Sequence, residues 1–89
     1  MGQDWKANPA AGFVQRLGKS PKELDVSSAP DHCPDLWLLD NDDVAVIGQD
    51  LTEAYRRRLP EGIGLAPGER LVVIPGVTLR SAKRDIPDE

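Results

Sequence analysis

Large apolar residues are unevenly spread along this chain, and that asymmetry limits where a core can form. Residues 1–33 contain five Leu, Ile, Val or Phe side chains, whereas residues 34–89 contain seventeen. The first segment also carries three prolines and the small polar run Ser27-Ser28-Ala29-Pro30. Because so few apolar side chains cannot offset the chain entropy lost on folding, we expect a flexible N-terminal arm at 1–33 and a small domain at 34–89.

The arm contains one candidate for ordered structure. Phe13, Val14 and Leu17 fall at positions i, i+1 and i+4, which predicts one or two amphipathic helical turns over residues 10–17 that end at Gly18. Such a short helix is marginal alone in water. The arm is therefore either a tail or a docking segment that orders on binding, and Trp5 favours docking because an exposed Trp is a typical anchor.

Residues 34–89 predict an α+β fold. Apolar runs at 35–39 and 44–47 flank the turn-forming residues 40–43, a pattern typical of a β-hairpin. A helix is predicted from Asp50, with Glu53 completing a capping box, to Pro60. A strand at 70–74 and a short helix at 77–84 follow. The order is β-β-α-β-α, with a three-stranded, mostly antiparallel sheet. A core this small buries little surface, so we expect further burial through a homodimer or through docking of the arm on the domain. Of these two, we favour the homodimer.

Charge and composition disfavour several classes of protein. The net charge of −4 disfavours a bulk nucleic-acid binder, because the phosphate backbone repels an acidic chain. A single cysteine, Cys33, permits no internal disulfide and favours a reducing cytoplasm. The longest apolar runs are four residues, too short for a membrane span.

The chain shows no pattern that points to catalysis or to a cofactor. Residues 40–51 lack the Gly and Glu that a calcium loop needs at its sixth and twelfth positions. His32 and Cys33 supply two of the four ligands of a structural zinc site, so only a site shared between subunits would form. Because no nucleophile, general base or phosphate loop appears, we expect no enzymatic activity and no cofactor.

Two groups of side chains are candidate binding residues. The aromatic candidates for a protein partner are Trp5, Phe13, Trp37 and Tyr55, although Trp37 also fits a core position in its apolar strand. The cationic candidates for nucleic acid are Arg56, Arg57, Arg58, Arg80, Lys83 and Arg84. The same cations are also explained by the preference of positive charge for helix C-termini.

Residues 44–59 and 64–73 resemble the swapped-hairpin DNA-binding domains of the AbrB type. Arg56 or Arg57 matches that family's helix arginine, and Gly68-Glu69 matches its glycine-acid pair. This resemblance implies a dimer that grips DNA. The longer segment 33–87 is similar to small actinobacterial proteins of unknown function that lie near helix-turn-helix regulators, which implies no activity.

Taken together, these patterns favour a non-catalytic interaction or regulatory module that docks on a protein partner, with a transcriptional regulator as one partner class. The alternative is a dimeric DNA-binding module of the AbrB-like type. A small enzyme with an unrecognised site is the third hypothesis.

Overall fold

The computed structural model describes residues 4–27 and 34–88, and it has an α+β fold with two small antiparallel sheets. The first sheet consists of β1 (Phe13–Arg16), β2 (Asp35–Leu39) and β3 (Val44–Ile47), in that spatial order. The second consists of β4 (Gln49–Asp50) and β5 (Val72–Val73). The predicted fold class and its three-stranded antiparallel sheet are confirmed.

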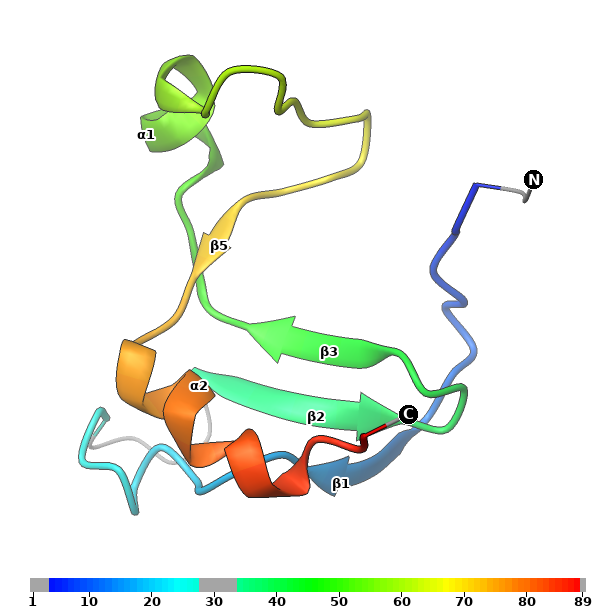
Figure 1. Ribbon diagram of the computed structural model, residues 1–89, viewed down its shortest axis with the longest axis vertical. Helices are drawn as coiled ribbons and strands as arrows, with labels where there is room; N and C mark the ends of the chain where they lie inside the picture. Colours follow the sequence, from blue (N-terminus) through cyan, green and yellow to red (C-terminus); the bar gives the residue numbers. More distant parts are fainter. Residues whose placement is uncertain (1–3, 28–33, 89) are drawn as a thin grey trace.

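The helices are short. The α-helix α1 (Thr52–Tyr55) continues into the 3-10 helix η1 (Arg56–Arg58), and α2 (Gly76–Ser81) is followed by the 3-10 helix η2 (Lys83–Asp85). Figure 1 shows the segment from the end of β3 through α1 to β5 as a long extension that rises from the first sheet, whereas α2 lies against that sheet. This segment contains β4, α1, η1 and β5. We call residues 49–73 the extension. In the part of the chain described here, no helix is long and apolar enough to cross a membrane.

The β2–β3 hairpin forms where the sequence predicts it. The Leu39 N–H donates to the Asp43 carbonyl at 2.9 Å, and Asp42 adopts a left-handed backbone with φ of 71°. Asp tolerates this conformation, and the Asn41 side chain accepts the Asp43 N–H at 3.0 Å. The turn residues therefore set the register, which pairs Leu38 with Val44 and Asp35 with Ile47.

The expected helix at residues 10–17 is wrong, since Phe13–Arg16 form β1 and pair antiparallel with β2. The apolar spacing here fits a strand as well as a helical turn, and pairing with β2 decides between them. The expected boundary at residue 33 therefore does not separate the first segment from the sheet. The third strand of that sheet is β1, whereas the predicted strand at 70–74 contributes only the two residues of β5 to the second sheet.

The core lies between the sheet and α2. Among residues 4–27 and 34–88, the buried side chains of Leu17, Leu36 and Ala82 form the core cluster, with Leu38 and Ile74 packed against them. Because side chains alternate along a strand, Leu36 and Leu38 place one face of β2 against α2. We call this the helix face. The face of the sheet on the other side, which carries Trp37, is the open face.

Candidate functional site

The open face carries a pair of aromatic side chains from different strands. The ring centroids of Phe13 on β1 and Trp37 on β2 lie 5.7 Å apart, with ring planes at 77°. This edge-to-face geometry is a favoured arrangement of two aromatic rings. Phe13 remains 67% exposed, although it is in contact with Trp37. We call these two residues the aromatic pair.

An ion pair on the same face holds Arg16 in place. Its guanidinium binds both carboxylate oxygens of Asp35, with Nε–Oδ1 at 3.0 Å and Nη2–Oδ2 at 2.9 Å. Asp35 is 7% exposed, and its carboxylate is satisfied by this bidentate partner and by a hydrogen bond from the Leu36 N–H. The Arg16 guanidinium carbon lies 4.9 Å from the centre of the Trp37 ring. Asp35 thereby fixes a cation over one half of the aromatic pair.

Trp5 lies at the β2–β3 turn. Its indole N–H donates to Oδ2 of Asp43 at 3.3 Å, and the ring is 69% exposed. This turn is at the end of the sheet where Phe13 pairs with Leu39. A segment that the sequence assigns to the arm therefore contacts the sheet at this turn.

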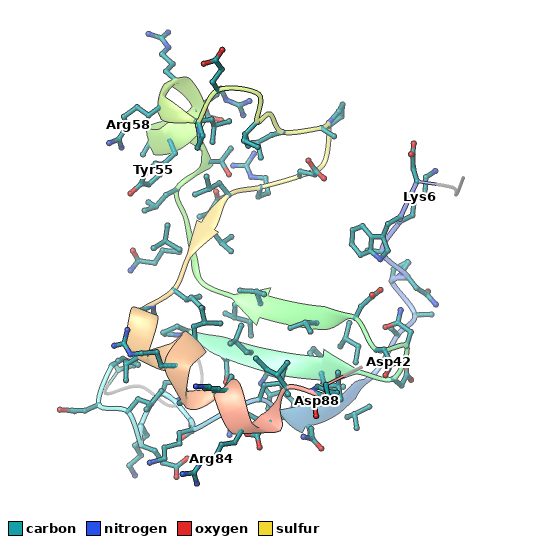
Figure 2. All side chains as sticks on the ribbon, viewed as in Figure 1. Lys6, Asp42, Tyr55, Arg58, Arg84 and Asp88 are labelled. Carbon is teal, nitrogen blue, oxygen red and sulfur yellow. The ribbon has the colours of Figure 1, made fainter. Side chains whose placement is uncertain are left out.

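Tyr55 lies on the extension, away from the other three aromatic candidates. The Arg58 guanidinium carbon lies 4.5 Å from the centre of the Tyr55 ring, and Figure 2 shows both residues at the far end of the extension. The structure thus brings Phe13 and Trp37 into contact and places Tyr55 elsewhere.

The six cationic candidates do not form one surface. Arg56, Arg57 and Arg58 form η1 on the extension, whereas Arg84 lies at the opposite end of the molecule, beside the first sheet (Figure 2). Arg56 is paired with Glu53 at 3.0 Å, and this contact lowers the pKa of Glu53 and raises that of Arg56. The Arg58 guanidinium donates to the Ala54 carbonyl at 3.1 Å. Two of the three arginines on η1 are therefore already bound to neighbouring groups of the same chain.

A polar cluster, which no local sequence pattern indicates, closes the base of the extension. The buried Thr52 hydroxyl donates to Oδ1 of Asp50 at 2.7 Å and accepts the Leu71 N–H at 2.8 Å. Arg70 also binds Oδ2 of Asp50, at 2.9 Å. We call Asp50, Thr52, Arg70 and Leu71 the Thr52 cluster. Asp50 and Thr52 lie about 20 positions before Arg70 and Leu71, so sequence spacing alone does not reveal the bonds between the two pairs.

The Thr52 cluster changes the acidity of Asp50. The side-chain and backbone hydrogen bonds from Thr52, followed by the bond from Arg70, lower the pKa of Asp50 from 3.8 to about 2.

The predicted capping box is wrong in its details. Leu51 is the N-cap of α1, and Glu53 binds Arg56 instead of returning a bond to the cap. The Asp50 carboxylate still accepts the Thr52 N–H at 3.1 Å.

Within residues 4–27 and 34–88, no group of three or more His, Cys, Asp or Glu side chains is arranged to hold a metal ion. The pair His32 and Cys33 lies outside the described residues. Asp43 serves the hairpin by accepting bonds from Trp5 and from the Asn41 amide at 3.2 Å. The acids near the turn thus have a structural role in the fold.

Comparison with known proteins identifies no relative of this chain. The resemblances drawn from the sequence motifs stay predictions. No protein-family model, curated protein or solved structure matches this chain.

Proposed function

We propose that this protein is a non-catalytic interaction module that docks on a partner protein through the aromatic pair on its open face. The observation that carries the proposal is that Phe13 is 67% exposed and packs edge-on against Trp37. Aromatic side chains that stand exposed at a fixed position are typical energetic anchors of protein interfaces, because burying them on binding removes a large apolar area from water.

The surroundings of the aromatic pair support this role. Trp37 contacts both Phe13 and Arg16, and the bond of Arg16 to Asp35 restricts the guanidinium. Side chains that are already ordered lose little entropy when a partner binds, so more of the contact energy appears as affinity. Trp5 extends the candidate surface towards the β2–β3 turn, whereas Tyr55 would contact a partner only through the extension.

The test is capture of partners from native extract by the full chain and by two matched variants. Phe13→Ala removes the exposed half of the aromatic pair, and Val14→Ala removes an exposed side chain, also on β1, that is not part of it. We expect Phe13→Ala to weaken capture of a specific protein about tenfold or more, and Val14→Ala to leave it unchanged. Equal capture by both variants would refute the aromatic pair as the docking site. Deletion of residues 1–33 is a poor substitute, because it removes β1 and the core residue Leu17.

The compartment and the class of partner belong to the same proposal. The single Cys33 supports a reducing cytoplasm, and the resemblance to proteins near helix-turn-helix regulators makes a transcriptional regulator the first partner to test. A homodimer is also part of the proposal.

The competing DNA-binding hypothesis makes a different prediction. It requires the cations of η1 to neutralise phosphates, which gives binding that falls steeply with salt concentration. Since Arg56 and Arg58 already have local partners and the net charge is −4, we expect no DNA binding at physiological salt. Binding that is steeply salt-dependent and that disappears when Arg56, Arg57 and Arg58 are all replaced by Ala would overturn this expectation.

A further inference from the structure

The outer edge of β3 is open. In the sheet order β1-β2-β3, no strand among the described residues pairs with that edge. The Leu39 N–H donates to the Asp43 carbonyl, so the alternation of antiparallel bonds directs the backbone of Ala45 and Ile47 towards β2. The N–H and C=O groups of Val44 and Val46 therefore point outwards and form a hydrogen-bonding edge that no described strand occupies.

This edge strand is short, but it has none of the charges, prolines or bulges that usually prevent edge strands from associating. The other edge strand, β1, has an irregular register between Phe13 and Gln15 and carries the charged Arg16. By contrast, β3 reads Val-Ala-Val-Ile, with no charge, proline or bulge. Val44 is 48% exposed and Val46 is 45% exposed. Natural edge strands usually carry charges, prolines or bulges, so a bare apolar edge indicates that another strand covers it.

The lone chain also exposes more surface than a folded monomer of its mass. Its accessible surface is 7305 Å² for 9.7 kDa. A compact monomer of that mass exposes about 5,100 Å². The radius of gyration is 14.6 Å, whereas about 12 Å is usual for this length. The extension, which projects from the first sheet (Figure 1), accounts for part of this additional surface, and the exposed side chains of β3 belong to the rest.

We propose that the occupant of this edge is a second copy of the chain, joined through antiparallel β3–β3 pairing into a continuous six-stranded sheet. With Val44 of one copy opposite Val46 of the other, every outward N–H and C=O of these residues finds a partner, which gives four backbone bonds about a two-fold axis. A strand pairing of this kind is self-complementary, because both copies use the same edge of β3.

The side chains at this edge support the same arrangement. Val44 and Val46 line a groove of about 500 Å³ on the helix face, together with Leu79 and Ile86 of the C-terminal segment. Leu79 is 55% exposed and Ile86 is 50% exposed. Edge pairing brings the two copies of this groove side by side, so apolar area on both helix faces is removed from water. The inference deepens the proposed homodimer and leaves the aromatic pair on the open face free, so either proposal can fail alone.

Sedimentation velocity of the full chain over a range of concentrations tests this interface. Val44→Pro removes an outward N–H but no bond to β2, and proline is tolerated at the first residue of an edge strand. Val44→Thr is the matched control, because it keeps the N–H and the shape of the side chain. We expect dimers of the wild type and of Val44→Thr, and dimerisation of Val44→Pro that is weaker by about tenfold or more.

Amide exchange supplies a second measurement on the wild-type chain. The amides of Ala45 and Ile47 should be protected at every concentration, whereas those of Val44 and Val46 should become protected only as dimers form. If Val44→Pro does not fold, Val46→Lys replaces it, since it sets like charges near each other across the pairing. A wild type that stays monomeric, a dimer that neither variant weakens, or Val44 and Val46 amides that exchange equally fast at all concentrations would each overturn the proposal.

Discussion

The backbone N–H of Gly18 donates to Oδ2 of Asp85 at 2.7 Å, which joins two residues 67 positions apart. The next residue, Lys19, donates its N–H to the Ser81 hydroxyl at 3.2 Å. The chain that follows β1 is thus bound to α2 and η2, directly after the core residue Leu17. The N-terminal third of the protein consequently contributes to the stability of the whole fold.

Replacement of Gly18 by Ala should destabilise the protein strongly. Gly18 has φ of 85°, and a Cβ there would lie 2.8 Å from the Ala82 backbone nitrogen, so both conformation and space oppose a side chain. We expect a loss of about 2–4 kcal/mol in the free energy of unfolding, measured by urea denaturation. Gly62→Ala is the control, because Gly62 has φ of 84° with no described atom near its Cβ position, and it should lose only about 1 kcal/mol. Equal losses at the two sites would contradict the packing of Gly18 on α2.

Leu17→Ala should show that the segment after β1 is part of the core. Leu17 is 3% exposed and packs with Leu36 and Ala82, so truncation removes apolar contacts and leaves a cavity. We expect a loss of about 2–4 kcal/mol in unfolding free energy. Val14→Ala, at a side chain that is 55% exposed, should change it by less than about 0.5 kcal/mol. Thermal and urea unfolding, followed by circular dichroism, measure the stability of both variants. A small effect of Leu17→Ala would show that the segment after β1 is a tail and not part of the core.

The two fully buried threonines should respond oppositely to replacement by valine. The Thr52 hydroxyl binds Asp50 and Leu71, whereas the Thr78 hydroxyl has no hydrogen-bond partner among the described residues. We expect Thr52→Val to lower the free energy of unfolding by about 2–3 kcal/mol, since it leaves polar groups unpaired. Thr78→Val should leave stability unchanged or raise it by about 1 kcal/mol, because it removes an unsatisfied buried hydroxyl. Loss of stability at Thr78 comparable to that at Thr52 would show that the Thr78 hydroxyl has a partner.

The Thr52 cluster also predicts a dependence of stability on pH. The pKa of Asp50 is lowered to about 2, chiefly by Thr52, so the folded state favours its ionised form. The resulting contribution to stability is fully present above about pH 4 and is lost as the pH falls through about 2. Titration of the Asp50 carboxyl carbon by NMR should show this low pKa, and Thr52→Val should raise it more than Arg70→Gln does. A larger rise in Arg70→Gln would reverse the order of the two causes.

Local patterns in the sequence predict the hairpin well, because its turn residues lie next to the strands that they join. Asp42 and Asn41 make the turn through their own backbone and side-chain bonds, so a short window contains all the information. The identity of β1 could not be derived in this way. Phe13, Val14 and Leu17 suit either a helical turn or a strand, and only pairing with β2, some twenty positions away, selects the strand.

In the candidate site, too, some features can be predicted from local sequence and others depend on contacts between distant residues. Phe13 and Trp37 are visible in the sequence as aromatic residues in a chain with few of them, but their contact depends on the register between β1 and β2. That register is set across a long connection and not by neighbouring residues. The ion pair of Arg16 with Asp35 is hidden for the same reason. Composition therefore indicates which side chains are candidates, and tertiary structure decides which of them meet.

The Thr52 cluster closes the extension at its base, and this makes the tip of the extension independent of the core. At Gly62, Gly64 and Gly68, no described atom apart from chain neighbours lies within 4 Å of the position of a Cβ. A loop tip with so few contacts accepts inserted residues without disturbing the elements that carry it. An epitope or a fluorescent peptide placed between Gly62 and Gly64 would therefore label the protein while the sheet, the aromatic pair and the β3 edge keep their structure.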